Sequence, residues 1–209
     1  MAYTVRNIII GAAALYVSTA DSTQAGWNGG PALPSAVNLT SFAATLEGNA
    51  NFRGVGFTTD GLELSYEPDY ADVEVDQLFD AAKLFKQSLK VMLSTSLTET
   101  NLENLLIAWS QQTSLLSSTT SDSTLGVAAG SLGDEPVERA LVAIGPAPRS
   151  VAGNKRERIY HCRRVLSVDT TAIALKRNEV TVFPVSFRLL PDPTFTNMEY
   201  GIIRDRNIT

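Results

Sequence analysis

Polar and apolar residues alternate along residues 60–80, DGLELSYEPDYADVEVDQLFD. Leu62, Leu64 and Tyr66 occupy every second position, with Glu63 and Ser65 between them. This period of two is typical of a β-strand with one buried and one exposed face. After Pro68 the apolar residues move from even to odd positions. Since a one-residue inversion turns every side chain to the other face, the pattern predicts a strand bent by a bulge or turn.

Further strands are predicted where β-branched and aromatic residues are enriched or alternate with polar ones. These segments are residues 5–17, 52–57, 88–97, 138–144, 155–168, 171–175 and 180–190. Asp60-Gly61 is a turn signal between residues 52–57 and the alternating segment, which forms a strand over 62–76. Pro184 cannot donate a backbone hydrogen bond, so it predicts an edge or an irregularity in the last strand.

One segment has helical periodicity instead. Apolar residues fall on one face of a helix over residues 98–109, where Thr98 or Thr100 can act as the N-cap. Residues 18–54 and 110–133 are rich in small polar residues and are expected to be long loops. Many strands with one α-helix predict a mainly β protein, a β-sandwich or barrel, in a single domain over residues 1–209.

Composition narrows the function classes. The chain of 209 residues has a formal charge of −5, which argues against affinity for nucleic acid because phosphate binding needs clustered cations. A single cysteine excludes an internal disulfide framework. The longest apolar run, residues 8–17, is too short for a transmembrane helix, so no membrane association is expected.

Few residues of the sequence are candidates for catalysis or metal binding. His161 is the only histidine, and its neighbour Cys162 would lie on the opposite face of a strand, so the two cannot form a nucleophile–base pair directly. No ligand spacing for a metal and no phosphate-binding loop is visible, so no cofactor is expected. A glycoside hydrolase needs two carboxylates placed together in a cleft, and the strand spacing of the acids in residues 60–80 singles out no such pair. We therefore expect no enzyme, with a β-domain hydrolase as the remote alternative.

A basic block follows in the second half of the chain. Its members are Arg149, Lys155, Arg156, Arg158, Arg163 and Arg164, with Glu157 as the single acid among them. One interpretation is that these cations pair with the acids of residues 60–80 within one subunit. The other is that the two blocks meet between subunits, where opposite charges set register and partner choice.

Several runs, taken in order, resemble the major tail tube proteins of long, non-contractile-tailed bacteriophages. They are GVGFTTDGLELSYEP at residues 54–68, VEVDQ at 73–77, LTETNLENL at 97–105, EVTVFPVSFRLLPDP at 179–193 and YGIIRD at 200–205. The similarity covers residues 8–17 and 54–205, except for 115–133, and residues 18–51 match nothing in it. No single run is diagnostic, and the order of all of them carries the resemblance.

The resemblance implies a tail-tube fold and a structural virion protein. Homohexameric rings would stack into a tube that surrounds the tape-measure protein and later conducts double-stranded DNA without binding it specifically. Tail terminator and tail-tip proteins would be the other partners, and the protein would reside in the virion tail after assembly in the host cytoplasm. The fold is shared with contractile-tail tubes and type VI secretion tubes, so a related ring-forming protein, such as a tail terminator, is the alternative.

Within that framework an acidic lumen wall would repel phosphates at close range, with screening beyond about 8–10 Å at physiological salt. The residues expected to face the lumen are Glu63, Glu67, Asp72, Glu74, Asp76, Ser94 and Ser96. The residues expected between subunits are Trp27, Asp80, Arg156, Arg158, Arg163 and Arg164. Residues 18–51 and 66–90 are expected to be excursions that contact neighbouring subunits or rings.

Overall fold

A computed structural model describes residues 8–35, 41–74, 76, 79, 81–169, 172–175 and 177–208. The strands are β1 (Ala14–Ser18), β2 (Phe52–Gly54), β3 (Thr58–Val73), β4 (Lys83–Leu97), β5 (Leu116–Ser118), β6 (Ser123–Leu125), β7 (Arg139–Ala147), β8 (Arg156–Ser167), β9 (Phe183–Leu190) and β10 (Gly201–Asn207). The helices are α1 (Phe42–Glu47), α2 (Leu102–Ala108) and the 3-10 turn η2 (Thr113–Leu115). The mainly β class is confirmed.

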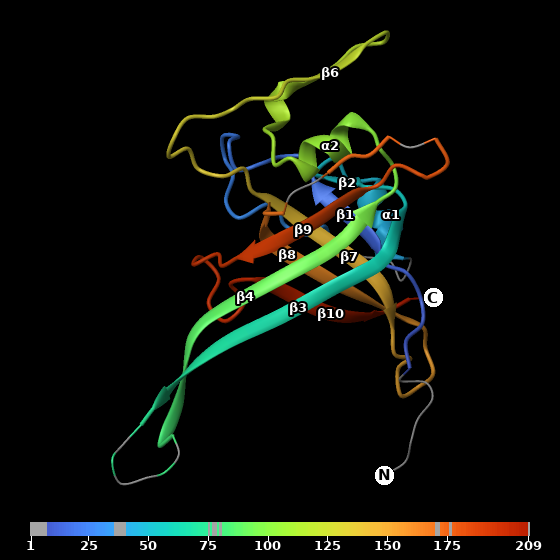
Figure 1. The fold of residues 1–209 in the computed structure, drawn as a ribbon. Helices are drawn as coiled ribbons and strands as arrows, with labels where there is room; N and C mark the ends of the chain where they lie inside the picture. Colours follow the sequence, from blue (N-terminus) through green and yellow to red (C-terminus); the bar gives the residue numbers. More distant parts are fainter. Residues whose placement is uncertain are drawn as a thin grey trace.

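All the main strands belong to one antiparallel sheet. Its order is β2-β1-β7-β8-β9-β4-β3, and β10 pairs with β8, while β5 and β6 form a separate small hairpin (Figure 1). One hydrophobic cluster joins Leu15 of β1 and Leu141 of β7 to Leu93 of β4 and Phe187 of β9. The sheet therefore curls until its two ends face each other across a core, but the described residues form no closed barrel.

The opposite face of β1 and β7 carries a second cluster. Tyr16 and Val142 pack there against Phe42 and Leu46 of α1. These two strands are consequently buried on both faces, which removes the alternation that marks a half-buried strand. Helix α1 lies inside the segment expected to be a long loop, so the expectation of a single α-helix is wrong.

The predicted helix is confirmed as α2, but its cap differs. Asn101 accepts a hydrogen bond from the backbone N–H of Asn104 at 2.7 Å, where Thr98 or Thr100 was expected. Asn104 is itself fully buried, and its amide donates to the carbonyl of Val55 at 2.8 Å and of Glu99 at 2.7 Å. This side chain fixes α2 against the turn between β2 and β3.

Several predicted strand bounds are corrected. β1 begins at residue 14, since 8–13 have no regular structure and 1–7 lie outside the described residues. Residues 172–175 are not a strand, and β7 continues beyond the predicted end at residue 144, through Gly145 and Pro146 to Ala147. β9 lies between β8 and β4 and is not an edge strand. Pro184 is tolerated because β8 pairs only with residues 187–190 of β9.

The predicted turn at Asp60-Gly61 is a bulge inside β3. Both residues have positive φ, 66° and 73°, and the hydroxyl of Thr95 donates to the Gly61 carbonyl at 2.7 Å. The pairing shifts there, from Thr59 opposite Ser96 to Glu63 opposite Ser94. A two-residue turn also requires residues with positive φ. The Asp-Gly signal therefore identified the backbone conformation correctly, but this conformation occurs in a bulge within one strand and not in a turn between two strands.

Candidate assembly surface

The outer half of the β3–β4 hairpin projects away from the body of the molecule (Figure 1). We call residues 66–74 and 81–90 the distal hairpin. Its large exposed side chains are Tyr66, Tyr70, Val73, Leu84 and Phe85. Leu84 is 61% exposed and Phe85 49% exposed. Phe85 lies opposite Ala71 and Leu84 lies opposite Asp72, so apolar groups occupy both faces of the ribbon.

One polar face runs from the inner half of the same hairpin into the base of the distal hairpin. Glu63 lies opposite Ser94 and Glu67 lies opposite Lys90, so these side chains share a face, and Ser96 belongs to it as well. Lys90 and Glu67 form an exposed ion pair at 3.8 Å. Arg188 of β9 lies beside Met92 on this face. The face is therefore mixed in charge and rich in serine, and the expected acidic lining is diluted by two cations.

The acids beyond Glu67 are placed differently. The pairing shifts between Asp69, opposite Ser88, and Tyr70, opposite Lys86, so the extra residue is Gln87 on β4. The predicted bulge is present, but because it lies on the partner strand it does not reset the alternation of β3. Asp72 lies on the opposite face from Glu63 and Glu67. Exposed Glu74 and Asp76 follow the end of β3, and the lumen contacts of all these acids stay a prediction.

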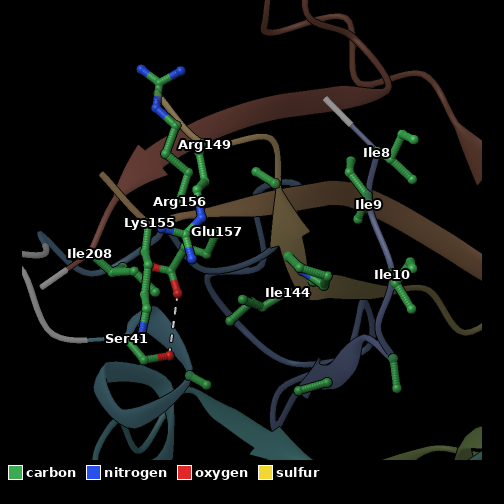
Figure 2. Close-up of a pocket in the computed structure, with 16 residues that line it drawn as sticks. Ile8, Ile9, Ile10, Ser41, Ile144, Arg149, Lys155, Arg156, Glu157 and Ile208 are labelled. Carbon is green, nitrogen blue, oxygen red and sulfur yellow. Dashed lines mark hydrogen bonds between the residues drawn. The ribbon is translucent and has the colours of Figure 1, made fainter. Parts of the chain in front are cut away.

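A cleft of about 760 Å³ opens on another side of the molecule. Ile8, Ile9 and Ile10 lie on one side of it, and Arg149, Lys155 and Arg156 lie on the other (Figure 2). Ile144 and Ile208 add apolar surface between them. Ile8 and Ile10 are 68% and 91% exposed. We call this the basic cleft.

Four arginines expected between subunits have partners within the chain. Arg158 binds Asp205 of β10 at 2.6 Å, and this hydrogen bond is the main reason that the pKa of Arg158 is raised. Arg164 binds Glu138 at 2.6 Å. Arg156 donates to the side chain of Asn207 at 2.8 Å. Arg163 lies over the ring of Phe195, with its guanidinium carbon 3.3 Å from the ring centroid.

These contacts assign the four side chains a role inside the subunit. Neither of the acidic residues that bind Arg158 and Arg164 comes from residues 60–80, so the intrasubunit pairing considered for the two charge blocks is wrong for these arginines. Their contacts with another subunit stay a prediction. Asp80, the acid expected at the same joint, lies outside the described residues.

Trp27 packs against the second hydrophobic cluster of its own chain. Beside it, Gly30 has φ 86°, and a Cβ there would lie 2.4 Å from the Cβ of Ala140. Glycine is required at that position by both the backbone conformation and the close approach to β7. The Trp27 loop is therefore ordered by the body of the molecule, and its contact with a neighbour stays a prediction.

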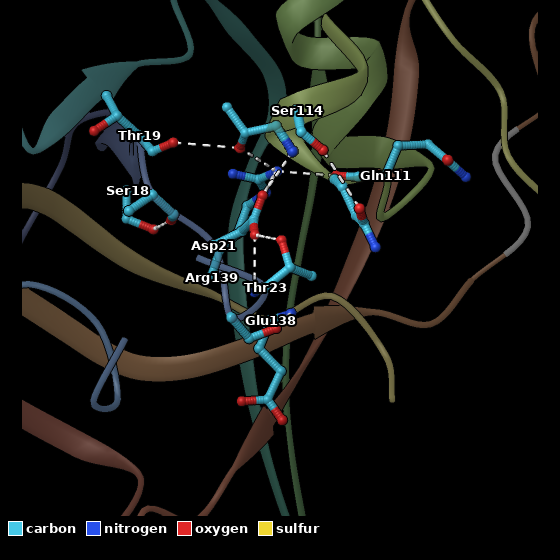
Figure 3. A network of polar contacts seen from close by, with 12 residues as sticks. Ser18, Thr19, Asp21, Thr23, Gln111, Ser114, Glu138 and Arg139 are labelled. Atoms are coloured by element: carbon cyan, nitrogen blue, oxygen red, sulfur yellow. Dashed lines mark hydrogen bonds and ion pairs between the residues drawn. The ribbon is translucent and has the colours of Figure 1, made fainter. Parts of the chain in front are cut away.

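A buried polar network fixes the start of the same long segment (Figure 3). Asp21 is fully buried and accepts hydrogen bonds from the backbone N–H of Thr113 at 2.6 Å and from Thr23, while its carboxylate lies 3.3 Å from Arg139. Burial raises the pKa of Asp21, but these hydrogen bonds outweigh it and hold that pKa below its usual value. Burial lowers the pKa of Arg139 to about 10, which leaves it charged at neutral pH.

The buried His161 and Cys162 give no nucleophilic site. Cys162 belongs to the first cluster, where burial raises the pKa of its thiol to about 12. His161 lies opposite Val142, on the other face of β8, and burial together with nearby Arg163 lowers its pKa to about 4. Within the described chain its ring nitrogens have no hydrogen-bond partner. The Cys162 thiol stays protonated at neutral pH, and His161 lies on the opposite face of the strand. The histidine therefore cannot deprotonate the thiol to form a nucleophile.

Other chemistry is equally unsupported in the described part of the chain. No group of three or more histidine, cysteine, aspartate or glutamate side chains there is arranged to hold a metal ion. The helices of that part are all too short or too polar to cross a membrane.

Comparison with known proteins found no matching family model and no match among curated proteins. The functional argument therefore depends on the surfaces themselves. Sequence reasoning identified the acidic strand and the basic block but missed the exposed apolar groups of the distal hairpin and of residues 8–10. Their signal was present as the pair Leu84-Phe85 and the triplet Ile8–Ile10, which interrupt the alternation with polar residues.

Proposed function

We propose that this chain is a structural subunit that assembles into rings and tubes, as in the tail tube of a long-tailed bacteriophage. The observation that carries the proposal is the distal hairpin, which exposes Tyr70, Leu84 and Phe85 on a ribbon with no core behind it. Tyr70 and Leu84 share one face of this ribbon and Phe85 lies on the other, and exposed apolar surface of this kind marks a protein–protein contact site. A second copy of the same chain is the partner that a tube requires.

The edge of the sheet supports the same proposal. β3 is the last strand in the sheet order, and its outer edge has no strand neighbour within the described chain. It runs for 16 residues, whereas proteins that remain monomeric keep edge strands short or cover them. Edge pairing between copies would continue the sheet from one subunit to the next, and an inner wall around a channel requires such continuity.

The polar face of the β3–β4 hairpin suits a conduit for DNA. In this proposal it is the lumen wall, with Glu63, Glu67 and Asp69 against Lys90 and Arg188, and with serines between them. A nearly balanced polar surface offers no cluster of cations for phosphates to bind. The genome would then pass through the lumen without adsorbing to its wall, after the tape-measure protein has left.

Electron microscopy of the purified chain at increasing concentration tests the proposal. Wild-type protein should form rings or tubes. A double variant with Leu84→Ser and Phe85→Ser should remain monomeric while its urea unfolding midpoint stays unchanged, because neither side chain belongs to the core. Matched substitution of Val127 and Leu132, exposed in a different loop, should leave assembly intact.

A wild-type chain that stays monomeric at every concentration would overturn the proposal, as would normal assembly of the hairpin variant. Rings that never stack would instead identify the related class of ring-forming terminator proteins.

A further inference from the structure

The basic cleft has the chemistry of a peptide-binding site. It combines an apolar surface formed by Ile9, Ile144 and Ile208 with cations on one side only. Ile144 is buried, whereas Ile9 is 40% exposed, so the cleft offers apolar area that the chain itself leaves uncovered. A segment that carries both apolar side chains and carboxylates would satisfy both parts.

Two of its cations have no ionic partner among the described residues. No side-chain carboxylate of the described chain lies within ion-pair distance of Arg149 or Lys155. The nearest acid in the cleft, Glu157, is already engaged. It accepts hydrogen bonds from the backbone N–H of Phe42 at 2.9 Å and from Arg206 at 3.1 Å. The positive side of the cleft is therefore uncompensated.

We propose that the basic cleft receives the tip of the distal hairpin from a second copy of this chain. The tip carries Asp72, Glu74 and Asp76 within five residues, and Val73 is exposed between them. Lys83 is the single cation that pairs with this stretch of β3. Acids beside an exposed apolar residue match a cleft with cations beside exposed isoleucines, and the match requires no ligand other than the chain itself.

The geometry excludes a contact within one molecule. The outer ends of β3 and β4 and the segments that form the cleft lie on different sides of the body (Figure 1). Six residues of β3 extend beyond Glu67, a reach of roughly 20 Å at the rise of an extended strand. The contact is then heterologous, with one surface of each copy engaging a different surface of the next. Repetition of such a contact builds a ring when the rotation closes and a filament when it does not.

This inference rests on the proposed assembly, and it names the joint between neighbouring copies. Charge reversal tests it directly. Glu74→Lys with Asp76→Lys should abolish assembly, and Arg149→Glu with Lys155→Glu should do the same. The chain that carries all four substitutions should assemble again, because the attraction is restored with its sign inverted. A four-fold variant that does not assemble, or a two-fold variant that does, overturns the contact.

The matched control reverses Asp122 and Glu135, which are exposed acids outside both surfaces. It should assemble like the wild type. All variants should keep the wild-type unfolding midpoint, since every substituted side chain is at the surface or at the rim of the cleft.

Site-directed cross-linking separates this inference from the proposed function. Cys162 is the only native cysteine and is buried, so it is first replaced with alanine. One chain carries Glu74→Cys and another carries Lys155→Cys, and the two are mixed under mild oxidation. A mixed disulfide that forms only in the mixture supports the contact. Rings or tubes without that cross-link would overturn the tip–cleft contact while leaving the tube proposal standing, and a chain that never assembles would overturn both.

Discussion

The inner and distal halves of the β3–β4 hairpin both carry large apolar side chains but differ in what covers them. In β4 the inner residues Leu93 and Leu97 are fully buried, with Ser94 and Ser96 between them on the polar face. Nine residues before Leu93, Leu84 and the adjacent Phe85 lie in the same strand and are largely exposed. The inner half lies over β1, β7 and α2, whereas the distal half extends past them. Apolar side chains alone therefore do not tell whether a stretch of strand is buried. Its position relative to the rest of the subunit decides whether other side chains of the same chain pack over it.

The sharpest test of this contrast is a matched pair of truncations. Leu93→Ala should lower the free energy of unfolding by about 2–5 kcal/mol, because it removes a fully buried side chain and leaves a cavity. Leu84→Ala should change the stability of the monomer by no more than about 0.5 kcal/mol. Urea denaturation of both variants at low protein concentration measures the difference. Equal losses would show that the distal hairpin is held by the body of the subunit.

Lowering the pH should reduce the free energy of unfolding through a buried histidine in the body of the molecule. The pKa of His161 is lowered to about 4 by burial and by Arg163, whereas an unfolded histidine titrates near 6.5. Between these values the unfolded chain binds a proton that the folded chain does not, so stability falls as the pH falls. From pH 7 to pH 5 the loss should be on the order of 2 kcal/mol.

Urea denaturation of the wild type and of His161→Leu at both pH values checks this expectation. The variant should lose most of the pH dependence in this window, because the carboxylates titrate mainly at lower pH. An unchanged dependence in the variant would assign the effect to another group.

The smallest effect is expected at the bulge near the base of the hairpin. Gly61→Ala should cost about 1 kcal/mol, since φ at this residue is 73° and a Cβ would meet no atom within 4 Å. The cost is thus backbone strain alone. Gly48→Ala is the control, because φ there is −84° and the added methyl group also has room. Equal thermal midpoints for the two variants would mean that the bulge relaxes without cost.

Local signals identified most of the secondary structure. The period of two in residues 88–97 and the helical period in 98–109 correspond to the C-terminal part of β4 and to α2. Helix α1 was missed because it has only six residues and is stabilised from outside. Glu157, more than a hundred residues away, accepts the backbone N–H of Phe42, and Tyr16 and Val142 cover the apolar face of α1. A helix of six residues with remote partners has no local pattern strong enough to predict it.

The candidate surfaces were predicted only in part. The acidic segment and the basic block are visible as charge runs, but the partners of Arg158 and Arg164 are not, because Asp205 and Glu138 are distant in sequence and become neighbours through strand pairing. Trp27 was expected between subunits on the strength of a long polar segment. The structure places it on the second cluster of its own chain.

The sequence by itself determined that this is a strand-rich chain, which residues alternate, where backbone with positive φ is needed at Asp60-Gly61, and that acids and cations are segregated into separate segments. Those properties depend on neighbours a few residues away. Only the tertiary structure decided that the sheet curls around one core without closing, that Gln87 and not β3 carries the second bulge, and that the distal hairpin and the basic cleft remain uncovered. These depend on which distant strands lie side by side, because burial and ion pairing are properties of the space that a side chain reaches.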